Sequence, residues 1–315
     1  MPNTPSLNKQ NTQLNKVAIV GCGRVGMTAA FSILHTGDVN ELVLHGRCKD
    51  DLIGEQLDLE HAMGVLHPAT ITATERYEDL AGCDIVVYAA GASQKPGETR
   101  LDLTEKNKAI LESILPHIIK HAPEAVILIV ANPVDILTYH AYRIAGWPKG
   151  RIFGSGTTLD TQRFRFHLSE LLHVSPSSVH AYILGEHGDH SFPTLSTASV
   201  GGQPLLHFPT ISEQQIQRAY EQARNAAYRI IDSKGATYYG IGAVVSHIVS
   251  CILSDNKTVL PLSIPLHQYY GQSGVAASVP CVVGRGGVED TLEIKLSWEE
   301  KQQFEQAVRE LKKYC

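Results

Sequence analysis

The chain has 315 residues, of which 43% are hydrophobic and 19% are charged. These fractions are typical of a globular protein and exclude a chain that is disordered as a whole. Its 27 basic and 32 acidic residues give a formal net charge of -5 without a basic stripe, so we expect no nucleic acid among its partners. The longest apolar run, residues 125–131, is too short to span a membrane, and we expect a soluble protein that binds small molecules.

Residues 1–15 are polar and contain no apolar stretch of the kind that a secretory signal requires. We expect them to form a flexible N-terminal tail. The 6 cysteines are far apart, and no two of them have the spacing of a zinc or redox site. The sequence therefore predicts reduced thiols, no bound metal and a cytoplasmic location.

The first half of the chain alternates short apolar runs with longer amphipathic segments. Strands are predicted at residues 17–20, 42–44, 85–88 and 125–130, and helices at 25–34, 52–63 and 101–120. Gly37 should end the first helix, and Pro116 should kink the third. Continuous apolar strands joined by helices indicate a parallel sheet covered on both faces. We expect an α/β fold in which residues 16–153 form a doubly wound Rossmann domain.

This alternation ends near residue 153. Helices are predicted at residues 158–172, 213–231 and 298–313, and strands at 178–184, 259–264 and 277–283, with turn-rich sequence around Gly201 and Gly202. The mixture predicts that residues 154–315 form a second, α+β domain that carries the catalytic and substrate-binding groups.

A glycine-rich turn follows the first predicted strand and opens the first helix. Backbone amides and the helix dipole at such a turn are placed to bind a pyrophosphate, although the same pattern alone would also suit a tight turn. The strand before it and the helix after it favour a dinucleotide, either a nicotinamide or a flavin nucleotide. The residues expected to bind it are Gly21, Gly23, Arg24, Val25 and Gly26.

An acidic residue normally ends the second strand of such a fold and binds the adenosine ribose hydroxyls. Here the strand at residues 42–44 runs into His45, Gly46 and Arg47, with no carboxylate. Nothing there would repel a 2′-phosphate, and Arg47 offers a guanidinium suited to one. Alternatively, Gly46 serves a turn and Arg47 is hydrated. The sequence leaves the choice between NAD and NADP open.

His187 lies between glycines after an apolar strand, which suits an imidazole that exchanges protons in a cleft. Asp160 and Arg163 share one face of a predicted helix, so Asp160 is placed to orient His187 and Arg163 to bind a substrate carboxylate. The alternatives are a structural histidine and a surface ion pair. Arg165 points to the other side of that helix.

The polar segment at residues 91–100 follows a strand at the edge of the sheet where ligands bind in doubly wound folds. It is interpreted as a lid that closes over the site, with an ordinary surface loop as the alternative.

Together these residues resemble the lactate and malate dehydrogenase family over residues 16–313. The resemblance includes the glycine turn at residues 21–26 and six further motifs in the family's order: QKPGETRLDL (94–103), ANPVD (131–135), GSGT (154–157), DTQR (160–163), GEHGD (185–189) and KGATYYG (234–240).

The resemblance implies that His187 exchanges a proton with the substrate oxygen while a hydride moves between the nicotinamide and C2 of a 2-hydroxy acid. Asp160 would stabilise the imidazolium, Arg163 would bind the substrate carboxylate, and Arg100 would polarise the carbonyl.

Three more residues are implied by the same resemblance. Asn132 would bond the substrate oxygen and help to position the nicotinamide. Thr237 would line the pocket, and Ile241 would lie against the nicotinamide face.

The lid position that separates substrates in this family holds Gln94, where malate dehydrogenases have Arg. Gln94 supplies no charge for a second carboxylate, so the resemblance predicts pyruvate and L-lactate as substrates. A malate or other 2-hydroxy acid dehydrogenase, or a regulator that binds nucleotides without catalysis, stays as the alternative.

Arg165 and His180 match positions that bind fructose 1,6-bisphosphate between subunits in bacterial lactate dehydrogenases. The resemblance therefore implies an allosteric effector and a homotetramer, against the alternative of an exposed arginine and a core histidine. The sequence assigns no role to His190.

Overall fold

The computed structural model describes residues 15–92 and 100–315. All but one residue of the predicted N-terminal tail and most of the predicted lid, Gln94 included, lie outside the described residues.

The first half of the chain forms a parallel six-stranded sheet in the order β3-β2-β1-β4-β5-β6, which is the strand order of a doubly wound Rossmann fold. Its strands are β1 (Lys16–Val20), β2 (Glu41–His45), β3 (Thr70–Thr74), β4 (Ile85–Tyr88), β5 (Val126–Ile129) and β6 (Ile152–Gly154). The expected fold class is confirmed.

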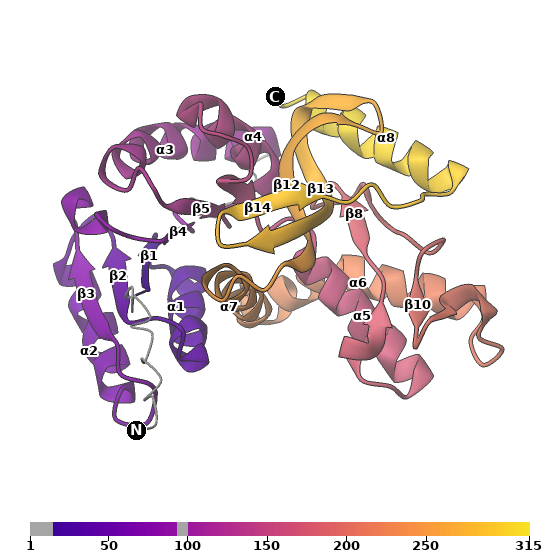
Figure 1. The fold of residues 1–315 in the computed structure, drawn as a ribbon, viewed down its shortest axis with the longest axis horizontal. Helices are drawn as coiled ribbons and strands as arrows, with labels where there is room; N and C mark the ends of the chain where they lie inside the picture. The colour runs from indigo at the N-terminus through magenta and orange to yellow at the C-terminus, as the bar shows by residue number, and fades with distance from the viewer. Residues whose placement is uncertain (1–14, 93–99) are drawn as a thin grey trace, which may run out of the picture.

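Helices cover both faces of this sheet (Figure 1). They are α1 (Arg24–Thr36), α2 (Ile53–Ala62), α3 (Arg100–His121) and α4 (Val134–Ala145), with short 3-10 turns at η1 (Asp50–Leu52) and η2 (Tyr77–Leu80). Val17 and Ile19 of β1 belong to the core that contains α1, whereas Ala18 and Val20 belong to the core that contains α3 and α4. Burial on both faces explains why these strands are continuously apolar.

The second half of the chain extends the same sheet. Ser263 in β12 pairs antiparallel with Gly154 in β6, and the order continues as β12-β13-β8-β9, with β14 paired to β13. These strands are β12 (Thr258–Tyr269), β13 (Gln272–Gly284), β14 (Gly287–Thr291), β8 (Ile183–Gly185) and β9 (Ser191–Pro193). The sheet is therefore continuous across the expected domain boundary at residues 153–154.

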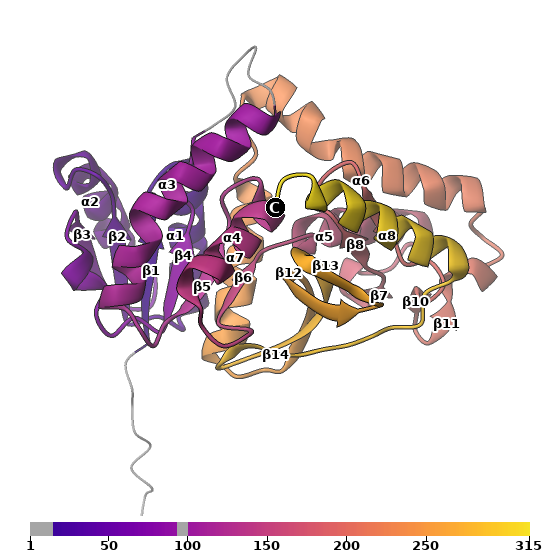
Figure 2. The same cartoon turned by 90° about the horizontal axis from the view of Figure 1, so that it is seen from above.

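The helices of the second half are α5 (Thr158–Leu172), α6 (Glu213–Lys234), α7 (Tyr239–Leu253) and α8 (Trp298–Lys312), with 3-10 turns at η3 (Pro176–Ser178) and η4 (Leu205–His207). A separate small sheet contains β7 (Val179–His180), β10 (Ser199–Val200) and β11 (Gln203–Pro204). Figure 2 shows the parallel strands at one end of the molecule and this second half at the other. α7 packs against α1, and its buried side chains belong to a core that extends from the Rossmann half into the second half.

One expected strand needs correction. The single strand expected at residues 178–184 is divided into β7 and β8, which lie in different sheets. Between them, the carbonyl of Ala181 accepts a hydrogen bond from the Arg165 side chain, 2.9 Å from Nε. α3 contains Pro116 and has nearly the predicted bounds, and α1 ends as expected at Gly37, whose φ of 75° is left-handed.

Among the described residues, no helix is both long and apolar enough to cross a membrane.

Candidate active site

The glycine turn joins β1 to α1, and two of its glycines are required by packing. Gly21 has a φ of 100°, and a Cβ there would lie 2.4 Å from the backbone nitrogen of Ala90. A Cβ on Gly26 would lie 2.1 Å from the Gly21 carbonyl oxygen. Contacts this short are impossible, so both positions must be glycine for β1, α1 and the chain after β4 to approach one another.

Gly23 differs from these two, because a Cβ there would meet no atom of the described residues within 4 Å beyond its own neighbours. It is the N-cap of α1, it has no side-chain cap, and the first turn of α1 carries no acidic residue. Arg24 is exposed and Val25 is half-buried beside it. The open space and the positive end of the helix dipole fit the pyrophosphate of a dinucleotide, which must approach the backbone closely.

The end of β2 is the expected ribose site. The Gly46 amide donates to the Thr74 carbonyl at 3.0 Å, and Arg47 is exposed. A Cβ on Gly46 would lie 2.9 Å from Cδ1 of Leu52, the flexible end of a side chain. A side chain at position 46 therefore needs only a small movement of Leu52.

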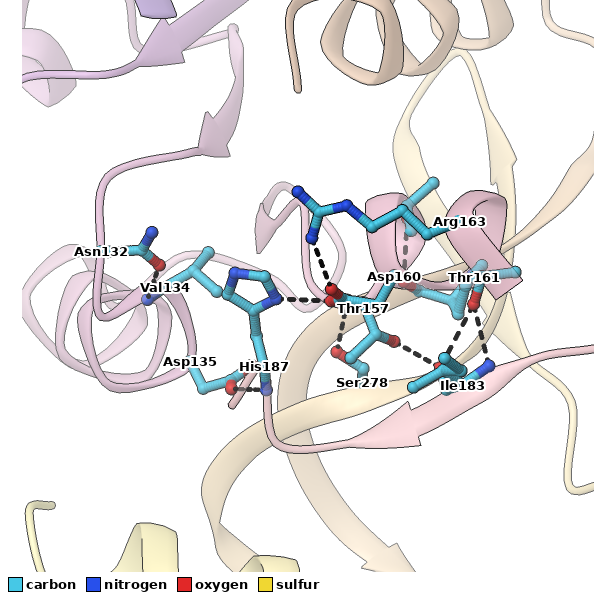
Figure 3. Close-up of polar contacts among 12 residues, drawn as sticks. Asn132, Val134, Asp135, Thr157, Asp160, Thr161, Arg163, Ile183, His187 and Ser278 are labelled. Atoms are coloured by element: carbon cyan, nitrogen blue, oxygen red, sulfur yellow. Dashed lines mark hydrogen bonds and ion pairs between the residues drawn. The ribbon is translucent and has the colours of Figure 1, made fainter. Parts of the chain in front are cut away.

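His187 and Asp160 meet directly, although they are distant in the sequence. Nδ1 of His187 lies 2.7 Å from Oδ2 of Asp160, and NH1 of Arg163 donates to Oδ1 of the same carboxylate at 3.2 Å (Figure 3). Asp160 is only 8% exposed. Each oxygen of this buried carboxylate thus has its own cationic partner.

These contacts shift the pKa values of both groups. Burial alone would lower the pKa of His187, but the charge and hydrogen bond of Asp160 outweigh it and raise that pKa above 6.5. Burial alone would raise the pKa of Asp160, but His187 and then Arg163 outweigh it and lower that pKa below 3.8. The pair favours an imidazolium beside a carboxylate.

A buried hydrogen-bond network holds α5 against β8. The Thr157 amide donates to Oγ of Ser278 at 3.0 Å, and the Thr157 hydroxyl donates to the Ile183 carbonyl. The Ile183 amide donates to Oγ1 of Thr161 at 2.9 Å. Since α5 carries Asp160 and β8 leads to His187, this network sets the distance between them (Figure 3).

Two buried carboxylates near His187 were not found from the sequence. Oδ2 of Asp135 accepts the backbone amide of His187 at 2.7 Å, and burial raises the pKa of Asp135 to about 6. Oε2 of Glu186 lies 2.7 Å from Nδ1 of His190, which gives His190 a hydrogen-bonding role. Asp135 ends the ANPVD motif, but spacing alone does not indicate contact with a residue so distant in the chain.

The remaining predicted residues lie on neighbouring elements. Asn132 is exposed after β5, and its Oδ1 accepts the Val134 amide at 3.3 Å. Thr237 is half-buried in the link between α6 and α7, and Ile241 packs from α7 against the core. Arg100 begins α3, but its side chain, like Gln94, lies outside the described part of the chain.

The predicted effector residues are Arg165 on α5 and His180 on β7, which precedes Ala181, the residue that Arg165 binds. Arg165 donates from Nε to Ala181, and its guanidinium lies 5.3 Å from the centre of the Tyr182 ring. His180 is exposed on β7, so it is not the core histidine of the alternative interpretation. Burial lowers the pKa of Arg165, an environment in which an anion would stabilise its charge.

The described residues contain no group of three or more His, Cys, Asp or Glu side chains that could hold a metal ion.

Comparisons with known proteins agree over nearly the whole chain. The family model "lactate/malate dehydrogenase, NAD binding domain" matches residues 15–154, and "lactate/malate dehydrogenase, alpha/beta C-terminal domain" matches residues 157–315. An L-lactate dehydrogenase of Thermoanaerobacterium saccharolyticum is 45% identical over 296 residues, covering 92% of this chain and 95% of the relative. An L-lactate dehydrogenase of Priestia megaterium is 44% identical over 301 residues, covering 94% of each.

A solved structure is also similar. The minor L-lactate dehydrogenase from Enterococcus mundtii has a TM-score of 0.92 at 39% identity, covering 96% of this chain and 97% of that chain.

The glycine turn gives a matched pair of substitutions. Gly26→Ala should lower the free energy of unfolding by about 1–3 kcal/mol, because the new Cβ collides with backbone. Gly23→Ala should change it by less than ~1 kcal/mol but weaken NADH binding by about tenfold or more, because the Cβ fills the phosphate space. Denaturant unfolding and fluorescence titration with NADH measure the two effects. Unchanged NADH affinity in Gly23→Ala would contradict this use of the space.

The His187 titration can be followed by NMR of its imidazole. We expect a pKa above 6.5 in the wild type and a lower pKa in Asp160→Asn, because burial then acts without the opposing carboxylate. Glu112→Gln removes a carboxylate from an exposed contact with His140 and should leave the His187 titration unchanged. An identical His187 pKa in wild type and Asp160→Asn would disprove the electrostatic role of Asp160.

Proposed function

This chain belongs to the lactate/malate dehydrogenase family, and from that premise we propose that it is an L-lactate dehydrogenase that interconverts pyruvate and L-lactate. The observation that carries the proposal is the shared carboxylate of Asp160, which contacts His187 through one oxygen and Arg163 through the other. One carboxylate thus holds a proton donor and a carboxylate-binding group side by side.

When bound, the nicotinamide cofactor supplies the hydride that adds to C2 of pyruvate. His187, held at Nδ1 by Asp160, donates the proton from its other ring nitrogen, Nε2, to the carbonyl oxygen. The carbonyl electron pair takes up this proton, so the product is neutral at that oxygen and His187 is left uncharged. Lactate oxidation reverses each transfer. The raised pKa of His187 supports a supply of imidazolium near neutral pH.

The substrate carboxylate is assigned to Arg163. NH1 of Arg163 faces Asp160, and within the described part of the chain its other nitrogens have no hydrogen-bond partner, so they can form a bidentate pair with the substrate. Arg100 would polarise the carbonyl, Asn132 would bond the same oxygen, and Thr237 would line the pocket.

The cofactor is assigned to the carboxyl edge of the parallel strands. When the cofactor is bound, its pyrophosphate would be held by the glycine turn, at Gly21, Gly23, Arg24, Val25 and Gly26. Asn132 and Ile241 would face the nicotinamide end. The exposed Arg47 beside Gly46 supports acceptance of NADPH as well as NADH.

Fructose 1,6-bisphosphate is proposed as an activator at Arg165 and His180. One arginine and one histidine are too few cations for two phosphates, so two chains would contribute, which supports a homotetramer. Arg165 shares α5 with Asp160 and Arg163, and His180 ends β7, the strand that precedes β8 and His187 in the chain. An effector there would act on both halves of the catalytic pair.

The substrate assignment is tested by comparing pyruvate and oxaloacetate reduction through NADH absorbance. We expect the wild type to prefer pyruvate by at least about a hundredfold in kcat/KM, since Gln94 supplies no charge for a second carboxylate. Gln94→Arg should shift the preference toward oxaloacetate, whereas the neutral Gln94→Met should not. A wild type that prefers oxaloacetate would instead be a malate dehydrogenase.

Cofactor choice is tested with NADH and NADPH in parallel. We expect the wild type to discriminate against NADPH by less than about a hundredfold, equivalent to ~2.7 kcal/mol. Gly46→Asp should increase that discrimination at least about tenfold by placing a carboxylate beside the 2′-phosphate. Gly54→Asp adds the same charge on α2, where a Cβ meets no atom of the described residues within 4 Å, and should leave the discrimination unchanged. If the wild type discriminated against NADPH more strongly than this, Arg47 would contact only solvent and not the cofactor.

Activation is tested by measuring the pyruvate concentration for half-maximal rate with and without millimolar fructose 1,6-bisphosphate. The effector should lower it in the wild type and in Arg309→Gln, which alters an exposed arginine on α8. It should have little effect in Arg165→Gln. If fructose 1,6-bisphosphate leaves the pyruvate saturation curve of the wild type unchanged, it is not an activator. A response in Arg165→Gln would mean that the effector binds elsewhere.

A further inference from the structure

The buried face of α3 is apolar from Leu111 onward but carries a polar side chain one turn earlier. Leu111, Leu115 and Ile118 are fully buried and pack in the core. One turn before Leu111, Asn107 is also buried, with 2% exposure, although its side chain is a primary amide. A buried amide is costly unless its hydrogen-bonding groups are satisfied.

The carboxamide of Asn107 is fully used. Its Oδ1 accepts the backbone amide of Ala92 at 2.8 Å, and its Nδ2 donates to the Ala92 carbonyl at 3.2 Å. Nδ2 also donates to the carbonyl of Asn132 at 2.7 Å. Both amide hydrogens and the amide oxygen therefore bond main chain, and they bond two different segments.

These two segments leave adjacent parallel strands. The last backbone contacts between them run from the amides of Val130 and Ala131 to the Tyr88 carbonyl, at 2.9 and 3.3 Å. After Tyr88 and Ala131, the side chain of Asn107 replaces the backbone hydrogen bonds between the strands. It connects the segment after β4 to the segment after β5. Asn132 is exposed there while Ala131 is buried, so the bridge holds the main chain of a residue that faces outward.

We propose that Asn107 is a positioning residue that bonds the main chain of Asn132 to that of Ala92 and so aims the Asn132 side chain at the substrate oxygen and the nicotinamide. This inference rests on the proposed function, because it concerns the same reaction. A side chain displaced by about 1 Å at a reacting centre lowers turnover by about a hundredfold.

The main variant is Asn107→Asp, which keeps the shape and loses both donors. Asn107→Ser is the neutral second variant if the first does not fold. Ile118→Val, on the same buried face of α3 but away from the bridge, controls for loss of packing. For each protein, kcat and KM for pyruvate are measured, together with the affinities for NADH and for ADP-ribose, which occupies the glycine turn without a nicotinamide.

We expect Asn107→Asp or Asn107→Ser to lose about 10- to 100-fold in kcat/KM for pyruvate and to bind NADH more weakly. ADP-ribose affinity should stay within about twofold in all variants, since the glycine turn is not touched. Ile118→Val should match the wild type in all constants. Equal losses of NADH and ADP-ribose affinity would show a merely structural role and overturn the proposal.

A double-variant cycle with Asn132→Ser tests whether Asn107 acts through Asn132. The double variant should lose little more activity than Asn132→Ser alone. Losses that multiply would overturn the proposal. If the wild type did not reduce pyruvate at all, the proposed function would fail, and the comparison of NADH with ADP-ribose would still decide whether Asn107 positions the nicotinamide end of the site.

Discussion

The buried carboxylate of Asp160 is the constraint on which the rest of the site depends. A carboxylate that is removed from water costs several kcal/mol unless it is paired and hydrogen-bonded. Here His187 and Arg163 each occupy one of its oxygens. The pairing explains why a histidine in the turn after β8 and an arginine on α5 are held in fixed positions, and why the imidazolium is favoured over the neutral ring.

The continuous sheet brings these groups to the cofactor. Gly21 follows β1 and Asn132 follows β5, at the carboxyl edge where doubly wound sheets bind ligands. β12 then pairs with β6, and β13 pairs with β8, so the strand that leads to His187 is part of the same sheet. After the strands β4 and β5 end, the side chain of Asn107 connects the two segments that follow them. The positions of these groups therefore follow from the pairing of the strands that precede them.

Much of this could be predicted from local pattern. β4 coincides with its predicted range because a strand covered on both faces is apolar throughout, and α5 coincides because its apolar period is helical. β3 was not predicted, since its sequence TITAT alternates threonine with apolar residues and does not form a continuous apolar run. α7 is apolar on most sides, so periodicity does not reveal it.

Asp160 and Arg163 are three residues apart in the helix, so their ion pair could be predicted from spacing. The contacts of Asp135 and Asn107 join residues far apart in the chain and were visible only in the structure.

The central claim is that His187 supplies the proton while the glycine turn binds the cofactor independently of it. Single-turnover reduction of pyruvate by His187→Asn with bound NADH tests both parts together. The account predicts a rate about 10²- to 10⁴-fold below the wild type, with NADH affinity unchanged within about threefold. A rate within about tenfold of the wild type would contradict the account, because His187 would then not be the proton donor.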